Sequence, residues 1–157
     1  MPATTELERH LESPNPDSTT ALGRALGGVA RAGDLVCLWG DLGAGKTHLA
    51  KAFGAGLGVR GTITSPSFIL MAEYEGRLPL FHVDLYRLAD ATDVLAGGLV
   101  DDRQTAGVTL IEWPDRMREA LPKARLDVLI EGTGEEPRTI TLRAGDPAYR
   151  RYLEASA

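Results

Sequence analysis

The segment at residues 40–47 constrains this chain more than any other feature. It is GDLGAGKT and fits the P-loop pattern G-x-x-x-x-G-K-[ST] without deviation. Its glycines let the backbone curl so that successive N–H groups point inward at phosphate oxygens. Lys46 supplies a positive charge for the β- and γ-phosphates, and the hydroxyl of Thr47 is a ligand for Mg²⁺. The segment, called the P-loop below, therefore predicts a nucleotide-binding site.

A P-loop follows a buried strand and precedes a helix, and the residues on both sides of this segment have the matching patterns. Residues 34–39 are a short apolar run that predicts a buried strand leading into the loop, and a helix is predicted from the loop to about Leu57. An earlier helix is predicted over 21–30, where apolar residues recur at helical spacing, and Gly33 is expected to end it. Three polar residues are candidates for its N-cap: Asp17, Ser18 and Thr19.

The rest of the chain predicts further strands and helices. A hairpin is expected from strands over 68–74 and 78–86. After it, the patterns predict a helix over 90–102, strands over 108–112, 126–131 and 138–143, a short helix ending at Leu121, and a terminal helix over 147–155. Because strands alternate with helices early and dominate later, we expect an α/β fold, a P-loop NTPase-like mixed sheet flanked by helices. The length predicts a single domain over residues 1–157.

Composition and charge restrict the surroundings and partners of the protein. No apolar run approaches the roughly 20 residues that span a bilayer, and the N-terminal segment has no apolar signal core. We therefore expect a cytoplasmic protein without a membrane partner. The formal net charge of −5 gives little sequence-independent attraction to phosphate backbones, so we expect no DNA partner and contact with RNA only through other proteins. The single cysteine, Cys37, is interpreted as a buried strand thiol.

Two acidic residues at predicted strand ends are candidates to complete the site. Asp84 and Glu112 each follow an apolar run, and open α/β sheets place their chemistry at such ends. Mg²⁺ in P-loop sites needs a carboxylate of this kind beside the hydroxyl of Thr47. His82 lies two residues before Asp84 and on the same face of the strand, although a lone histidine is more often structural. The proline after Trp113 favours an extended conformation there, which is expected to fix the direction of the neighbouring Glu112 carboxylate.

Four segments together resemble the TsaE family, bacterial ATPases required for making threonylcarbamoyladenosine on tRNA. They are GDLGAGKT at 40–47, SPSF at 65–68, HVDLYRL at 82–88 and IEWPDR at 111–116, in the family's order over about residues 15–145. GDLGAGKT alone is shared by many P-loop proteins, so the combination carries the resemblance. The resemblance implies a small α/β ATPase that works with the TsaB–TsaD complex, which brings the tRNA.

The resemblance also implies roles for individual residues. Lys46, Asp84 and Glu112 would be catalytic, with Mg²⁺ held by Thr47 and Glu112, and with Asp84 near the metal or the attacking water. The residues expected to contact ATP are Thr19, Asp41, Leu42, Gly43, Ala44, Gly45, Lys46, Thr47, His48 and Gly134. The chain departs from the family at His48 and Ser67, where threonine is usual, and at 97–102, which lacks a tyrosine.

Two alternatives stay open from sequence. A small-molecule or nucleotide kinase of this size would also carry a P-loop, although residues 90–107 contain one arginine, Arg103, where an arginine-rich lid is expected. A nucleotide-gated binding module with negligible turnover has the same sequence signature as a slow ATPase. The nucleotide is predicted to be ATP, because the guanine-reading pattern [NT]-K-x-D does not occur.

Overall fold

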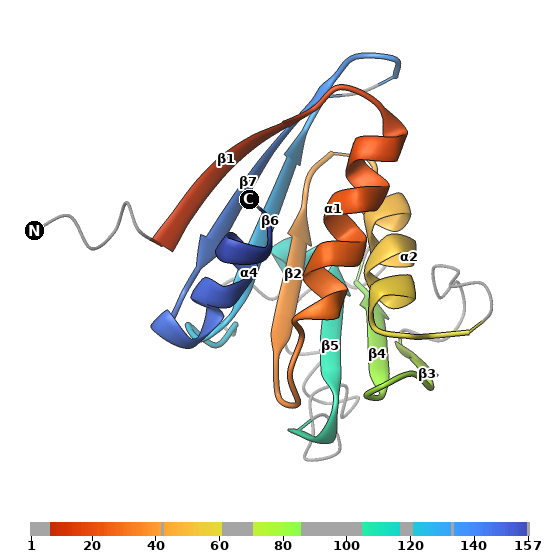
Figure 1. Cartoon of the computed structure of the whole chain (residues 1–157), viewed down its shortest axis with the longest axis vertical. Helices are drawn as coiled ribbons and strands as arrows, with labels where there is room; N and C mark the ends of the chain where they lie inside the picture. Colours follow the sequence, from red (N-terminus) through yellow and green to blue (C-terminus); the bar gives the residue numbers. More distant parts are fainter. Residues whose placement is uncertain are drawn as a thin grey trace, which may run out of the picture.

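One mixed β-sheet organises the chain (Figure 1). The computed structural model describes residues 7–41, 43–60, 71–85, 105–116, 121–132 and 134–156, and within them seven strands follow the order β1-β7-β6-β2-β5-β4-β3. The strands are β1 (Glu8–Ser13), β2 (Leu35–Trp39), β3 (Met71–Tyr74), β4 (Leu80–Asp84), β5 (Val108–Glu112), β6 (Leu126–Glu131) and β7 (Arg138–Ala144). Neighbours are parallel from β6 through β2 and β5 to β4, and the other pairs are antiparallel. The carboxyl ends of these four parallel strands therefore meet at one edge.

Helices α1 (Pro16–Gly28), α2 (Lys46–Gly56) and α4 (Arg150–Ala155) cover one face of this sheet (Figure 1). Two short 3-10 turns, η3 (Pro114–Arg116) and η5 (Pro147–Tyr149), complete the described elements. The main core lies between the helices and the sheet and includes Leu26, Val36, Leu38, Leu49, Phe53, Leu110, Val128, Leu142 and Tyr152. A second core lies on the opposite face and consists of the strand residues Cys37, Val83 and Ile111 together with Leu85 and Leu121. None of the described helices is long and apolar enough to cross a membrane.

Most predicted elements are confirmed, with differences at their ends. The strand before the P-loop, the helix after it, the antiparallel β3–β4 pair and the antiparallel β6–β7 pair are as expected. The thiol of Cys37 is buried in β2, also as expected. The terminal helix divides into η5 and α4. Residues 61–70 and 86–104, which include SPSF and the helix predicted over 90–102, lie outside the described residues.

Two expectations about the N-terminal region are wrong, and one strand there was not predicted. The N-cap of α1 is Asn15, whose side-chain oxygen accepts a hydrogen bond from Ser18 N at 2.9 Å, and Asp17, Ser18 and Thr19 lie inside the helix. Pro16 explains the earlier start, because its fixed φ suits the first helical position. The helix ends at Gly28 and not near Gly33. Strand β1 was not predicted, because its only apolar residue is Leu11, and it forms by pairing with β7 along its whole length.

Close contact between α1 and α2 sets the position of the P-loop helix. Gly27 of α1 lies against the backbone of α2, where an added Cβ would be 2.1 Å from the carbonyl oxygen of Phe53. At Gly23 an added Cβ would be 2.6 Å from the Cβ of Ala52. Because interiors packed this closely leave no room for sliding, the N-terminus of α2 is fixed relative to the sheet.

Replacing Gly27 by alanine is expected to destabilise the protein by about 1–3 kcal/mol, because the added methyl group forces two helix backbones apart. Gly28→Ala is the matched control. Gly28 is the next residue of α1, and an added Cβ there meets no atom of the described residues within 4 Å. The better helix propensity of alanine therefore predicts unchanged or slightly higher stability. Chemical denaturation of the wild type and both variants measures these effects. Equal stability of the two variants would contradict the close approach of α1 and α2.

Candidate nucleotide-binding site

The P-loop joins the carboxyl end of β2 to the N-terminus of α2 (Figure 1). Gly43 has φ +84° and Gly45 has φ +109°, in the left-handed region that favours glycine. A hydrogen bond of 3.0 Å from Ala44 N to the Asp41 carbonyl closes a turn within the loop. Gly45 is the N-cap of α2, and no side chain of the described residues caps this terminus. The N–H groups of its first turn and the helix dipole therefore favour an anion at this position.

Lys46 lies in the first turn of α2 and is buried. Its ammonium group donates to the Gly40 carbonyl and lies 3.5 Å from the Asp41 carbonyl. The same nitrogen is 3.4 Å from the ring centroid of Trp113, a cation–π contact. Burial lowers the pKa of Lys46, and nearby carboxylates oppose that shift: Glu112, Asp115, Asp41 and Asp84. The electrostatic environment of the P-loop cation is thus acidic.

A chain of hydrogen bonds connects α2 to the two neighbouring strands. Thr47 donates from its hydroxyl to Oε1 of Glu112 at 3.0 Å. The other carboxylate oxygen of Glu112 lies 2.6 Å from Nε2 of His82. Glu112 is 2% exposed and His82 is 0% exposed, so this contact is screened from water. His82 thereby orients the carboxylate of Glu112, a predicted site residue. From sequence, a structural role was the more usual expectation for this histidine.

The oxygens of Thr47 and Glu112 suit a Mg²⁺ ion. This metal prefers octahedral coordination with oxygen ligands at about 2.0–2.1 Å, which separates adjacent ligands by about 3.0 Å. The 3.0 Å between the Thr47 hydroxyl and the Glu112 carboxylate matches that separation. The described residues contain no group of three or more His, Cys, Asp or Glu side chains that could hold a metal. Two protein ligands suit Mg²⁺ bound together with phosphate and water.

Asp84 lies beside Glu112 at the same sheet edge. The parallel register of β4 and β5 pairs Asp84 with Glu112, and a hydrogen bond of 3.1 Å from Leu85 N to the Glu112 carbonyl continues this pairing past the strand. Asp84 is half-buried, whereas Glu112 is buried. The structure therefore brings both predicted acids together near the P-loop and gives Asp84 the greater access to solvent.

The conformation of Trp113 differs from the prediction. Its φ is +60°, in the left-handed region, and not the extended conformation that the following proline favours. A bulky residue occupies this region only where its surroundings compensate for the strain. The ring lies against the ammonium group of Lys46 and packs on the core around Cys37.

A pocket of about 460 Å³ adjoins the P-loop. It is lined by Ser13, Pro14, Asn15, Pro16, Thr19, Ala44, Gly45, His48, Gly134, Glu135, Glu136 and Arg138. Within the wall, the hydroxyls of Ser13 and Thr19 lie 2.5 Å apart, and His48 Nε2 lies 2.9 Å from the hydroxyl of Thr20. Three segments that are separate in the sequence, within 13–19, 44–48 and 134–138, thus surround one cavity next to the N-terminus of α2.

Comparisons with known proteins agree with this arrangement. The family model "Threonylcarbamoyl adenosine biosynthesis protein TsaE" matches residues 13–140. The Bacillus subtilis (strain 168) "tRNA threonylcarbamoyladenosine biosynthesis protein TsaE" is 40% identical over 141 residues, covering 89% of this chain and 88% of that protein. The Streptomyces coelicolor protein of the same name is 41% identical over 128 residues, covering 77% and 86%. The crystal structure of Bacillus subtilis YdiB superposes with a TM-score of 0.76 at 36% identity, covering 95% of this chain and 93% of YdiB.

The chain belongs to the TsaE family. Its α/β, P-loop-like fold and its place among proteins of threonylcarbamoyladenosine biosynthesis follow from this membership. Five of the residues that the TsaE resemblance implied as ATP contacts line the pocket, namely Thr19, Ala44, Gly45, His48 and Gly134. Asp41 and Gly43 lie in the P-loop and are exposed. Leu42 lies outside the described residues.

Sequence reasoning missed part of this TsaE site. Ser13, Asn15 and Arg138 line the pocket but were not proposed as site residues. The pairing of Ser13 with Arg138 across β1 and β7 places both there, and no local pattern indicates a contact over that distance in sequence. The contact of Trp113 with Lys46 was also not predicted.

Removing His82 tests how strongly the site depends on its contact with Glu112. We expect His82→Phe to lower the free energy of unfolding by about 3 kcal/mol, because a buried carboxylate loses a hydrogen-bonding partner. In the double variant His82→Phe/Glu112→Gln, the buried charge is also removed, so the loss should be smaller than the sum of the single losses. A denaturation double-mutant cycle with Glu112→Gln measures this coupling, and additive losses would show that the two side chains do not interact.

Proposed function

We propose that this protein is a Mg²⁺-dependent ATPase that serves threonylcarbamoyladenosine modification of tRNA. One observation carries the proposal: the uncapped N-terminus of α2, the ammonium group of Lys46 and the Thr47–Glu112 oxygen pair meet at one sheet edge. These groups match the requirements of phosphoryl transfer, namely donors for phosphate oxygens, a cation for developing charge and ligands for Mg²⁺. Membership of the TsaE family supplies the biological setting.

The P-loop and the adjoining pocket together accommodate one nucleotide in this proposal. The phosphates lie along the P-loop, and the base and ribose lie in the pocket beside Thr19, His48 and Gly134. A volume of about 460 Å³ is within the range of small-molecule sites. We propose ATP as the nucleotide because the sequence lacks the guanine-reading pattern.

The side chains divide the chemistry among them. Thr47 and Glu112 would hold Mg²⁺, which would neutralise part of the negative charge of the phosphates. Lys46 contacts the same phosphates as a point charge. Asp84, which is beside Glu112 and less buried, orients the attacking water by accepting its hydrogen bond. His82 keeps the Glu112 carboxylate in position through the contact at 2.6 Å.

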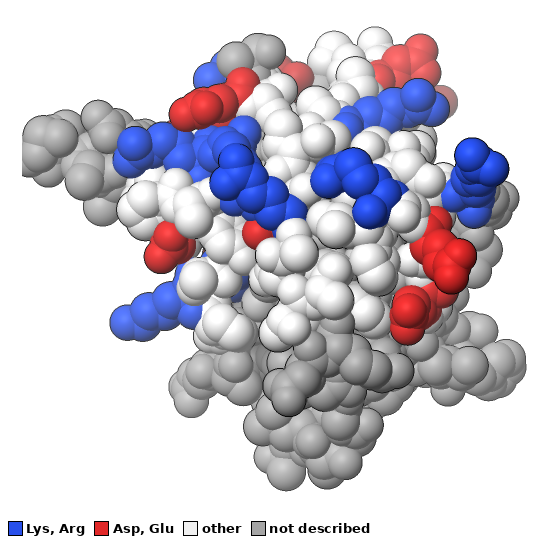
Figure 2. Space-filling view, turned by 60° about the horizontal axis from the view of Figure 1, so that its bottom comes forward, with Lys and Arg blue, Asp and Glu red and all other residues white. Residues whose placement is uncertain are grey.

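Protein partners belong to the proposal. The net charge is −5, and on the face in Figure 2 the basic side chains form a band among uncharged ones with acidic side chains at its flanks. The negative net charge gives little sequence-independent attraction to the phosphate backbone of RNA. We therefore propose that tRNA is reached indirectly through the TsaB–TsaD complex, and that hydrolysis drives or resets that complex. The cytoplasmic location expected from the sequence stays a prediction.

Phosphate release from Mg·ATP tests the proposal for the protein alone, with candidate acceptors and with TsaB–TsaD. We expect slow release alone, faster release with the complex and no effect of acceptors. Lys46→Ala should lose tight ATP binding and release, because it removes the cation of the P-loop. Phosphate transfer to an acceptor would identify a kinase instead. Binding without release under every condition would identify a nucleotide-gated binding module.

The two acids are expected to respond differently to neutral substitution. Glu112→Gln should weaken Mg·ATP binding by about tenfold or more and slow hydrolysis, because Mg²⁺ loses an anionic oxygen. Asp84→Asn should leave affinity within about threefold and slow hydrolysis by about 10²-fold, as for loss of a water-orienting base. Calorimetric affinity and single-turnover hydrolysis measure both effects. Loss of metal-dependent binding in Asp84→Asn alone would reverse the two roles.

A further inference from the structure

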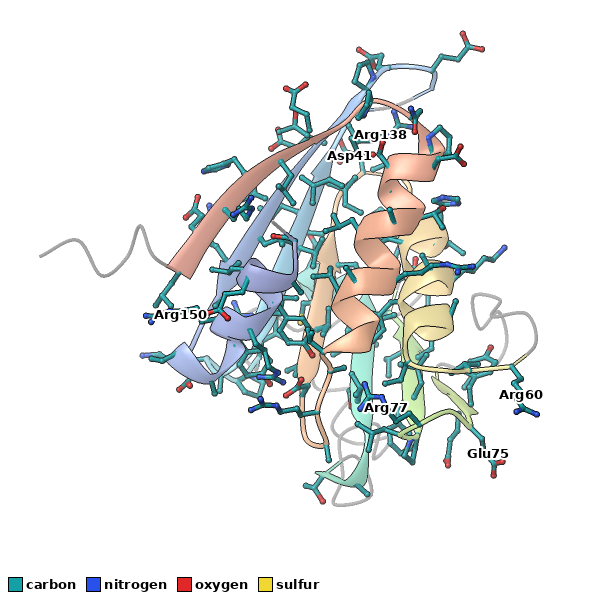
Figure 3. The ribbon with its side chains drawn as sticks, in the orientation of Figure 1. Asp41, Arg60, Glu75, Arg77, Arg138 and Arg150 are labelled. Atoms are coloured by element: carbon teal, nitrogen blue, oxygen red, sulfur yellow. The ribbon has the colours of Figure 1, made fainter. Side chains whose placement is uncertain are left out.

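Arg138, the first residue of β7, contacts four backbone carbonyl groups in two separate loops. In the P-loop, its Nε donates to the Ala44 carbonyl at 2.9 Å and its Nη2 to the Gly43 carbonyl at 3.4 Å. In the loop between β6 and β7, Nη2 donates to the Gly134 carbonyl at 3.0 Å and Nη1 to the Glu136 carbonyl. Figure 3 shows Arg138 at the same end of the sheet as Asp41 of the P-loop.

The two loops that Arg138 joins form facing parts of the same pocket. Ala44 and Gly45 line it from the P-loop, and residues 134–136 line it from the β6–β7 connection, here called the hairpin loop. Arg138 lines the pocket as well. Its planar guanidinium group presents several N–H donors in a fixed fork, so one side chain sets the position of one loop relative to the other.

The contact with Ala44 also constrains the donors that face a ligand. In a trans peptide the carbonyl and the N–H group point in opposite directions, so holding the Ala44 carbonyl fixes the direction of the Gly45 N–H. Gly45 has φ +109° and Gly43 has φ +84°, and glycine at both positions leaves the backbone free to adopt other conformations. The contacts of Arg138 therefore restrict the backbone conformation of the P-loop, which its glycines alone leave free.

We propose that Arg138 is a positioning residue that couples the P-loop to the hairpin loop. When a phosphate group binds at the P-loop, this coupling orders the hairpin loop around the base and ribose. This inference rests on the proposed nucleotide site. In this proposal Arg138, which lies near the end of the chain and outside the P-loop motif, contributes to nucleotide affinity. The loss of Arg138 is then expected to weaken nucleotide binding without any loss of a P-loop residue.

The test compares Arg138→Gln with Arg143→Gln in the full chain, using Mg·ADP as the probe. Arg143 is the matched control, because it lies on the same strand, is exposed and pairs with Glu8 at 3.1 Å away from the pocket. We expect Arg138→Gln to weaken ADP binding by about tenfold or more, since it removes charge-assisted hydrogen bonds. Arg143→Gln should bind within about twofold of the wild type. Calorimetry gives both affinities.

Hydrogen exchange separates coupling from a general structural role. In the wild type and in Arg143→Gln, ADP should slow amide exchange at both the P-loop and residues 134–136. In Arg138→Gln, saturating ADP should slow exchange at the P-loop and leave residues 134–136 unprotected. Arg138→Lys, which keeps the charge but not the fork, should show the same loss of protection and serves where the glutamine variant does not fold. Wild-type affinity and wild-type protection in the Arg138 variants would overturn the inference, whereas absence of ADP binding by the wild type would overturn the proposed function itself.

Discussion

The hydrogen-bonded chain from Thr47 through Glu112 to His82 is the interaction on which the site depends. It joins the first turn of α2 to the last residue of β5 and the middle residue of β4, so three elements are held together at one point. The cost of burying Glu112, which is 2% exposed, is offset only while these partners stay in place. The parallel pairing of β4 and β5 places His82 and Glu112 on adjacent strands, and the register of the same pairing sets Asp84 beside Glu112. The fold and the proposed metal site are therefore consequences of the same strand pairing.

The pocket beside the P-loop depends on a different set of contacts, made by the two ends of the chain. Strand β1 brings Ser13 to the pocket by pairing with β7, and α1 begins at once after it with Asn15 as its cap. The contacts of Gly27 with the backbone of α2 then fix α1 against the P-loop helix. A nucleotide site of this kind needs more than its eight-residue motif, since the walls around the base and ribose come from segments more than a hundred residues apart in sequence.

The sequence was sufficient to predict secondary structure where the local pattern of apolar residues agrees with burial in the fold. Strand β5 was predicted over 108–112 and observed over the same residues, because all five are buried and three of them, Val108, Leu110 and Ile111, are apolar. Strand β1 was missed because it has one apolar residue and forms through long-range pairing with β7. The extended conformation predicted for Trp113 was wrong, because its contact with Lys46 and the packing of its ring outweigh the preference set by proline. Thr19 and Gly134 came from the family resemblance, since no spacing in the chain connects them to the P-loop.

The charges around Lys46 lead to a final conclusion about the proposed function. Four carboxylates influence this one ammonium group, namely Glu112, Asp115, Asp41 and Asp84. An isolated triphosphate would bring further negative charge into a region where acids already outnumber the P-loop cation, and the whole chain is acidic as well. A divalent cation that enters with the nucleotide reverses this balance and gives the carboxylates at the strand ends an attractive partner. Under the proposed function, the same acids that would repel free ATP therefore select the magnesium-bound form.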